Sequence, residues 1–274
     1  MTRAVGWQLY KRIVKKPIDR SIYSGMRIRC YPDSNSASDL FYFGDYYEYD
    51  EMLFLARYLR PKDGFIDGGA NIGTYSLLAA SIVGAEGRID AFEPTPKTAR
   101  RLIENLALNG IDWVRVHRAA LADRTGVAKF ISDTDVSNRL VVQVEKGSAV
   151  MEVPCVSLDE SLPADARYAM AKLDLEGAEE AAVRGAEIHL RDANPPVWQV
   201  EGWPHLLRTM GSSREALLSL FVDRGYQIAW YHADDNRLEW GEDAVRGRQN
   251  FFAISRSMRQ EVVERLRQSR LDTD

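Results

Sequence analysis

GFIDGGANIGTY, residues 64–75, is the stretch that decides the fold of this 274-residue chain. Its apolar start predicts a short buried strand that ends at Asp67, and a turn through Gly68 and Gly69 then leads into a helix. Glycines permit a sharp turn and let a ligand approach the backbone closely. The unpaired N–H groups at the start of a helix favour an anionic group. The stretch therefore predicts a strand, a ligand-binding turn and a helix in succession.

Strands and helices alternate around this turn. We predict strands at residues 64–67, 88–92, 113–116, 126–131, 151–156, 168–175, 196–200, 225–231 and 250–254. We predict helices at residues 51–59, 71–83, 95–109, 178–190, 212–224 and 256–271, and polar loops at residues 33–39 and 132–140. Alternation at this interval indicates an α/β fold with a parallel sheet and right-handed crossovers. In such a fold ligands bind at the carboxyl ends of the strands.

The composition is that of a globular protein, with 45% hydrophobic and 28% charged residues. We divide the chain into a lead-in or lid segment at residues 1–50, a catalytic domain at 51–256 and a C-terminal helix at 257–274. The net charge of −4 and the lack of a basic stripe in the catalytic region disfavour nucleic acid as a partner. Cys30 and Cys155 lie far apart without metal-ligand spacing, so we expect reduced thiols and a cytoplasmic location.

The N-terminal segment combines apolar and basic residues. Residues 1–20 contain no continuous apolar run of the kind that a secretory signal or a membrane span requires. They mix Trp7, Leu9, Tyr10, Ile13 and Val14 with Lys11, Arg12, Lys15 and Lys16. This mixture is found in helices that lie on a membrane surface. The plainer interpretation is a short helix that packs on the domain or on a partner subunit, so peripheral membrane contact and a homodimer both stay open.

Charge selects the cofactor. Glu93 ends the second predicted strand, 26 residues after Asp67, where an acidic side chain can accept hydrogen bonds from both ribose hydroxyls of an adenosine. A dinucleotide-binding turn would place a pyrophosphate beside the glycines, where Asp67 would repel it. Asp67 would instead attract the ammonium group of a methionine moiety. We therefore predict S-adenosylmethionine, with Asp123 after the third strand as either an adenine contact or a simple turn residue.

Four blocks of the sequence resemble the FkbM-type methyltransferases, a branch of the class I S-adenosylmethionine-dependent enzymes. The blocks are IDGGANIGTYS, AFEP, ENLALNG and KLDLEGAEEAAVRGA, and the resemblance covers roughly residues 45–202. One departure is Gly68, where the family's loop has isoleucine, and we expect it to loosen the turn. The resemblance implies a class I methyltransferase fold, which is Rossmann-like with a mostly parallel seven-stranded sheet and helices on both faces.

The same resemblance implies S-adenosylmethionine as methyl donor and usually O-methylation. Acceptors in the family include sugar hydroxyls of surface polysaccharides and glycolipids, and hydroxyls of polyketide-type natural products. Carried over to this sequence, the residues that hold the methionine end are Asp67, Gly69, Asn71 and Gly73, with Thr74 next to them. Glu93, followed by Pro94, would hold the ribose, Asp123 would lie near the adenine, and Asp174 would lie beside the sulfonium.

Methylation of a hydroxyl of high pKa also needs a base or a metal. Strand alternation would place Lys172, Asp174 and Glu176 on one side if the strand at 168–175 stays extended to its end. Neighbouring carboxylates can raise one pKa, which suits a general base. The candidate catalytic residues are therefore Asp174, Glu176, Glu201 and, as an alternative base, His205.

Other interpretations of these residues stay open. Asp174 and Glu176 could cap the following helix, because carboxylates favour that end. A divalent metal is left unassigned, although carboxylates are ligands that Mg²⁺ accepts. The acceptor cleft has no motif, but residues 33–49 could act as a lid, and six aromatic residues are either cleft or core: Tyr46, Tyr47, Trp203, Trp230, Tyr231 and Trp240.

Three functions follow from these observations. The first is an O-methyltransferase that acts on a saccharide or glycolipid hydroxyl, and the second is one that acts on a small natural product. The third is a nucleotide-binding module without catalysis, in which the acidic cluster around Asp174 only caps a helix.

Overall fold

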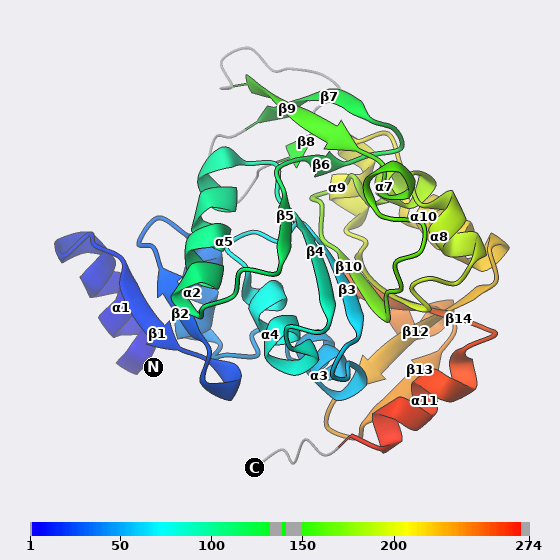
Figure 1. Cartoon of the computed structure of the whole chain (residues 1–274), viewed down its shortest axis with the longest axis horizontal. Helices are drawn as coiled ribbons and strands as arrows, with labels where there is room; N and C mark the ends of the chain where they lie inside the picture. The colour runs from blue at the N-terminus through cyan, green and yellow to red at the C-terminus, as the bar shows by residue number, and fades with distance from the viewer. Residues whose placement is uncertain (1, 132–138, 141–149, 270–274) are drawn as a thin grey trace.

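The computed structural model describes residues 2–131, 139–140 and 150–269. An eight-stranded sheet lies at its centre, in the order β13–β12–β14–β11–β10–β3–β4–β5 (Figure 1). Its strands are β3 (Gly64–Gly68), β4 (Arg88–Phe92), β5 (Arg115–His117), β10 (Met170–Leu173), β11 (Val197–Glu201), β12 (Tyr226–His232), β13 (Arg237–Trp240) and β14 (Asn250–Ser255). The five strands from β11 to β5 are parallel, whereas β14, β12 and β13 pair antiparallel. The predicted mostly parallel α/β sheet is confirmed.

The main sheet has one strand more than the seven that we predicted. The additional strand is β13, which pairs with β12 at the edge of the sheet. Its residues alternate between exposed Arg237 and Glu239 and half-buried Leu238 and Trp240. A strand at a sheet edge needs few apolar residues because one side faces solvent, so the charged sequence of β13 does not read as a strand.

Helices cover both faces of the sheet. One face carries α3 (Tyr49–Tyr58), α4 (Thr74–Val83), α5 (Pro96–Leu108) and α11 (Arg259–Arg267). The other carries α6 (Leu158–Ser161), α7 (Glu179–Arg184), α8 (Glu187–Arg191), α9 (Pro204–Thr209) and α10 (Arg214–Asp223). Phe65 of β3 packs into the first core and its neighbour Ile66 into the second, because successive side chains of a strand point to opposite faces. Burial on both sides accounts for the apolar start of the deciding stretch.

Four strands form a second, smaller sheet beside the main one. They are β6 (Ala120–Leu121), β7 (Gly126–Ile131), β8 (Arg139–Leu140) and β9 (Val150–Val156), in the order β6–β9–β7–β8. The strands predicted at residues 126–131 and 151–156 are confirmed. The loop predicted at residues 132–140 lies outside the described residues except for β8.

The prediction of a polar loop at residues 33–39 is wrong. The helix α2 (Asn35–Tyr42) begins there, and the Ser34 side chain caps it by accepting a hydrogen bond from the N–H of Ala37. Serine is favoured both in loops and at helix caps, so composition alone does not separate the two. The rest of the lead-in comprises α1 (Thr2–Ile13), the hairpin of β1 (Ile18–Ser21) and β2 (Arg27–Cys30), and a short 3₁₀ turn at Tyr23–Gly25.

The single helix predicted at residues 178–190 is divided into α7 and α8. The break lies at Gly185, which packs directly against the backbone that follows β6. A Cβ added to Gly185 would lie 2.1 Å from the carbonyl oxygen of Ala122. The close approach of the two backbones therefore requires a glycine here, and a glycine weakens the helix.

The lead-in and the C-terminal helix share the core of the catalytic domain. Trp7 of α1 and Leu266 of α11 belong to the same buried apolar cluster as Phe54 of α3. Cys30 and Cys155 are buried and carry free thiols. Burial raises the pKa of Cys30 to about 12, so its thiol stays protonated near neutral pH.

Candidate functional site

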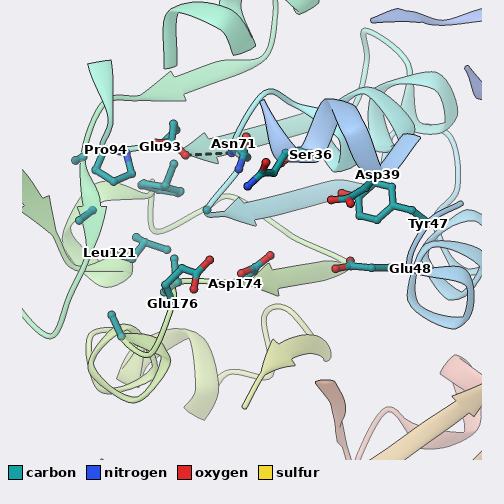
Figure 2. Close-up of a pocket in the computed structure, with 17 residues that line it drawn as sticks. Ser36, Asp39, Tyr47, Glu48, Asn71, Glu93, Pro94, Leu121, Asp174 and Glu176 are labelled. Carbon is teal, nitrogen blue, oxygen red and sulfur yellow. Dashed lines mark hydrogen bonds between the residues drawn. The ribbon is translucent and has the colours of Figure 1, made fainter. Parts of the chain in front are cut away.

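A cavity lies at the carboxyl edge of β3, β4 and β10 (Figure 2). Three sequence-predicted segments contribute to its wall, namely the β3–α4 turn, the end of β4 and the segment after β10. The lead-in contributes a further part of the wall, with side chains from α2 and from the segment that precedes α3. The ligand edge expected for a parallel sheet is thus lined by residues far apart in the sequence.

The β3–α4 turn is held tightly against the strands on both sides of it. The N–H groups of Gly69 and Ala70 each donate to the carbonyl of Phe92 at 3.0 Å. Gly69 has a φ of +74°, and a Cβ added to it would lie 1.9 Å from the carbonyl oxygen of Asp174. Asn71 also has a positive φ, of +51°, which asparagine tolerates better than most residues. Gly69 and Asn71 both line the cavity.

Two leucine side chains fill the space beside Gly68. A Cβ added to Gly68 would lie 2.8 Å from the Leu173 side chain and 2.9 Å from that of Leu121. These two leucine side chains therefore occupy the space that an isoleucine at position 68 would need.

Glu93 joins the turn to the end of β4. Its Oε2 accepts a hydrogen bond from the N–H of Asn71 at 3.1 Å, and its Oε1 accepts one from the N–H of Thr95 at 2.8 Å. Burial raises the pKa of Glu93 to about 7, although these two hydrogen bonds act to lower it. Each carboxylate oxygen has a second lone pair, so Glu93 keeps an acceptor on both oxygens for the two hydroxyls of a ribose. This donor and acceptor arrangement fits an adenosine.

The end of the cavity beyond Glu93 is apolar. Phe92, Pro94 and the run Ala119–Leu121 line it. Asp123, the predicted adenine contact, is exposed beyond this run and does not line the cavity. It lies beside Arg124, at 4.0 Å. A flat apolar ring such as adenine would therefore contact aliphatic and aromatic side chains here.

Asp67 lies beneath the turn and does not line the cavity. It is fully buried, and its Oδ2 accepts a hydrogen bond from the Ser76 hydroxyl at 2.6 Å. Its Oδ1 has no hydrogen-bond partner among the described residues. Burial raises the pKa of Asp67, while the neighbouring Lys172 lowers it. The structure thus places Asp67 behind the turn, where its charge reaches the cavity without direct contact.

Two carboxylates face each other across the other end of the cavity. Figure 2 shows the side chain of Glu48 pointing toward Asp174. The Lys172 ammonium donates to Asp174 Oδ2 at 3.1 Å. Burial alone would lower the pKa of Lys172, but the carboxylates of Asp174, Asp67 and Glu48 outweigh burial and raise it. Lys172 therefore carries a buried positive charge that holds Asp174 in place.

Two hydrogen bonds in series link Glu48 to the sheet. The Tyr75 hydroxyl donates to Glu48, and Gln199 Nε2 donates to the Tyr75 hydroxyl at 2.9 Å. Burial raises the pKa of Glu48 to about 7, although Lys172 acts in the opposite direction. A carboxylate whose pKa lies near neutrality can exchange a proton with an acceptor under physiological conditions.

The residues after β10 do not alternate as predicted. The strand ends at Leu173 instead of continuing to 175, and Glu176 has a φ of +55°. Asp174 and Glu176 still line the cavity. The reason for the turn is Gly177, where an added Cβ would lie 2.5 Å from the carbonyl oxygen of Leu206, so the chain must pass α9 closely.

Several predicted site residues lie near the cavity without lining it. Gly73 and Thr74 start α4, where the Thr74 hydroxyl lies 2.9 Å from that of Tyr47. Glu201 lies at the end of β11, and burial together with Asp174 raises its pKa to about 10. His205 is exposed on α9, next to the ring of Trp203.

Glu48 and the polar side chains of α2 line the cavity but were not among the predicted site residues. Glu48 directly precedes α3, where a carboxylate ordinarily caps a helix, but its side chain makes no capping bond. Nothing in its sequence context separates a cap from a cavity residue. Of the six aromatic residues proposed for the cleft, Tyr47 lines this cavity, and the others do not: Tyr46, Trp203, Trp230, Tyr231 and Trp240.

In the described part of the chain, no group of three or more histidine, cysteine, aspartate or glutamate side chains is arranged to hold a metal ion.

Comparisons with known proteins bear on this site. The methyltransferase FkbM domain model matches residues 67–228. No curated protein matches the chain. Similar solved structures include an S-adenosylmethionine-dependent O-methyltransferase from Thermotoga maritima, with 12% identity and a TM-score of 0.43 over 76% of this chain and 64% of that chain. This chain therefore spans less than two thirds of that protein's length.

Two further structures are similar at the same level. A precorrin-6y C5,15-methyltransferase from Geobacter metallireducens has 15% identity and a TM-score of 0.41 over 76% of this chain and 85% of that chain. Fibrillarin from Aeropyrum pernix, in complex with natively bound S-adenosylmethionine, has 15% identity and a TM-score of 0.41 over 73% of this chain and 71% of that chain. All three TM-scores are below 0.5, so these similarities say nothing about the acceptor.

Proposed function

The chain belongs to the methyltransferase FkbM domain family, whose model covers more than half of it, and we propose that it transfers a methyl group to a hydroxyl of a saccharide or glycolipid. Family membership makes the chain an S-adenosylmethionine-dependent methyltransferase. The choice of an oxygen acceptor, and of a sugar as its carrier, is our proposal. It rests on the side chains that the lead-in and the segment after β10 bring to the cavity.

The residues present fit the cofactor. Glu93 would bind the ribose hydroxyls through the free lone pairs of its two oxygens, and the apolar run Ala119–Leu121 would contact the adenine. The methionine end would lie against the β3–α4 turn, where the negative charge of Asp67 behind the turn attracts an ammonium group. Gly69 lets the turn lie directly against the backbone of Asp174, where a Cβ would overlap the carbonyl oxygen.

The observation that carries the acceptor proposal is the polar wall of the lead-in. Asn35, Ser36 and Asp39 of α2 line the cavity together with Tyr47. An amide, a hydroxyl and a carboxylate side by side can bind several hydroxyl groups at once, and an aromatic ring can stack on the face of a sugar. An apolar polyketide would leave these polar groups unpaired, which costs free energy. A saccharide therefore suits this wall better than an apolar natural product.

The chain's own residues supply the proton transfer. When bound, S-adenosylmethionine provides a methyl group on a sulfonium, and transfer breaks the C–S bond as the new O–C bond forms. Asp174 would accept the proton of the acceptor hydroxyl, while Lys172 holds the carboxylate in position at 3.1 Å. Alignment of the two reactants by the cavity would contribute much of the acceleration, up to roughly 7–11 kcal/mol for well-oriented groups.

The test is methyl transfer from isotopically labelled S-adenosylmethionine to separate panels of oligosaccharides, glycolipids and polyketide-type hydroxyl compounds. We expect label in a sugar methyl ether, identified by mass spectrometry after hydrolysis of the glycan. Label in the polyketide panel alone would overturn the saccharide assignment. Label in an ester or an amine would overturn O-methylation of a hydroxyl.

Asp174→Asn is the matched variant for this assay. We expect it to bind S-adenosylmethionine within about threefold of the original affinity and to lose roughly 10²–10⁴-fold in kcat, because the base is replaced by an isosteric amide. Full turnover in Asp174→Asn would show that another group accepts the proton. Binding without transfer in the unaltered chain, on every panel, would favour the non-catalytic module.

A further inference from the structure

The outward face of α1 carries apolar side chains. Val5, Leu9 and Ile13 are 57%, 54% and 76% exposed, and their spacing of four residues places them on one side of the helix. The opposite side is the one that packs inward, where Trp7 is buried and stacks on Phe41 at 4.2 Å. A helix at the surface of a globular protein normally presents polar side chains to solvent. The exposed stripe on α1 therefore calls for a partner.

The apolar surface extends beyond α1. Phe43, at the end of α2, is 71% exposed, and its ring contacts that of Tyr42. The Tyr42 hydroxyl accepts a hydrogen bond from Gln8 of α1, so Phe43 lies beside the helix. Val14 and Ile18, which follow α1, are also exposed. Figure 1 shows α1 at the periphery of the molecule.

Positive charge accompanies this surface. The first 18 residues contain five lysine and arginine residues and no aspartate or glutamate, although the whole chain has a net charge of −4. Arg12, Lys15 and Lys16 are exposed at the end of the helix, next to Ile13. Their ammonium and guanidinium groups would bind phosphate oxygens, whereas the aliphatic stripe would avoid water.

We propose that α1 docks on the surface of an anionic lipid bilayer, with Val5, Leu9 and Ile13 entering the headgroup region and Arg12, Lys15 and Lys16 contacting lipid phosphates. The helix lies in the plane of the interface, since none of the helices in the described part of the chain is long and apolar enough to cross a membrane. A second copy of the chain is the less suitable partner. A two-fold interface would bring the same cationic segment of both copies together, where like charges repel.

Docking would also place the proposed acceptor wall close to the lipid. Lys11 donates to the Ser38 hydroxyl at 3.0 Å, and Trp7 Nε1 donates to the same oxygen at 3.0 Å, so α1 is attached to α2. Asn35, Ser36 and Asp39 of α2 line the cavity. This last step rests on the proposed function and favours a glycolipid over a free saccharide, whereas the docking itself does not depend on the acceptor.

The test is vesicle flotation of the full chain. We expect it to float with vesicles of phosphatidylcholine and phosphatidylserine, to float poorly with phosphatidylcholine alone, and to dissociate as salt is added. The double variant Leu9→Ser/Ile13→Ser should bind at least about tenfold more weakly, because two aliphatic side chains no longer enter the interface. Lys15→Glu/Lys16→Glu should also lose at least about tenfold.

A matched control removes two exposed aliphatic residues elsewhere. Val127→Ser/Ile188→Ser alters side chains on β7 and α8 that are as exposed as those of α1, and should float like the original chain. Equal binding to neutral vesicles, no binding to anionic ones, or binding that Leu9→Ser/Ile13→Ser leaves intact would each overturn the proposal. So would a dimer in sedimentation velocity that this variant dissociates.

Transfer to a soluble acceptor separates this proposal from the proposed function. Leu9 and Ile13 lie outside the cavity, so Leu9→Ser/Ile13→Ser should keep its turnover on a soluble saccharide. If Leu9→Ser/Ile13→Ser no longer floats but keeps its turnover, the result supports docking. If the original chain shows no turnover on the soluble saccharide, only the catalytic proposal is affected.

Discussion

At the scale of single residues, Glu93 holds the β3–α4 turn and is the proposed ribose contact. Both of its oxygens accept backbone N–H bonds, from Asn71 and from Thr95. We expect Glu93→Gln to weaken S-adenosylmethionine binding by about 1.5–3 kcal/mol, because one acceptor oxygen becomes a donor and the charge is lost. Calorimetry measures the affinity, and an unchanged melting temperature would show that the fold is retained. An affinity equal to that of the original chain would contradict the ribose assignment.

Glu48 is the residue whose titration should appear in the kinetics. Burial raises its pKa to about 7, so its carboxylate forms as the pH rises through neutrality. We expect kcat at saturating cofactor to rise from about pH 6 to about pH 8, because ionised Glu48 stabilises positive charge on the acceptor oxygen during transfer. In Glu48→Gln we expect kcat to fall about tenfold at high pH, and the rise of kcat with pH to disappear.

Glu93→Gln is the matched control for that pH profile. The pKa of Glu93 is also raised to about 7, but Glu93 lies at the ribose end and not beside the reacting oxygen. Its replacement should change the cofactor KM and leave the rise of kcat with pH in place. If kcat of Glu48→Gln still rises between about pH 6 and about pH 8, a group other than Glu48 causes the rise.

Some residues that line the cavity could be predicted from the sequence, and others could not. Gly69, Asn71 and Glu93 reach the cavity because a strand end, a turn and a helix start determine their positions locally. Glu48 and Asp174 are 126 positions apart in the chain and meet only when the lead-in packs against the sheet. No local pattern encodes such a contact, so reasoning from periodicity identified Asp174 and missed Glu48.

At the scale of elements, the turn between β3 and α4 requires glycine for two reasons. Gly69 has a positive φ, and it also lies against the backbone of Asp174. Gly110 has a similar φ of +68°, with nothing within 4 Å of an added Cβ. We expect Gly69→Ala to lower the free energy of unfolding by about 1–3 kcal/mol more than Gly110→Ala, because only the first creates a steric overlap. Chemical denaturation of both variants measures this difference.

The same pair of variants also tests the link to binding. Gly69→Ala should displace the turn from Asp174 and weaken S-adenosylmethionine binding, whereas Gly110→Ala should not. Equal effects of the two substitutions on stability and affinity would show that the close approach has no energetic importance.

Elements with a strong apolar period were predicted well, and those with mixed composition were not. The strand at residues 250–254 and the helix α4 have largely apolar sequences, which burial in the sheet layers demands. α2 and β13 are short and polar, and their state depends on what they pack against. Tertiary contacts override local preference in such segments.

At the scale of the whole molecule, buried carboxylates make stability depend on pH. Burial raises the pKa of Glu48 and Glu93 to about 7 and that of Glu179 to about 8. An unfolded glutamate titrates near about 4.3. The folded protein therefore binds more protons than the unfolded chain between these values. The stability that the three groups contribute is fully present below about pH 4.3 and is lost as the pH rises through about 7 to 8.

We expect the melting temperature to fall between about pH 6 and about pH 8.5, measured without cofactor. Glu179→Gln should flatten this decline, because glutamine carries no charge and its single carbonyl oxygen can still accept from both Leu175 and Gly177, as Oε1 of Glu179 does. Glu86→Gln, at an exposed position, is the control and should leave the decline unchanged. A melting temperature that rises over this range would contradict the burial argument.

The position of the acceptor wall has a consequence for how chains of this kind diversify. The family match begins at residue 67, whereas Asn35, Ser36, Asp39, Tyr47 and Glu48 all precede it. Under the proposed function, the polar wall that contacts the acceptor therefore precedes the part of the chain that matches the family. A chimera that receives residues 35–48 from a relative would inherit that relative's acceptor wall together with this chain's nucleoside site. Exchange of this one short segment would then change the acceptor while the nucleoside site stays as it is.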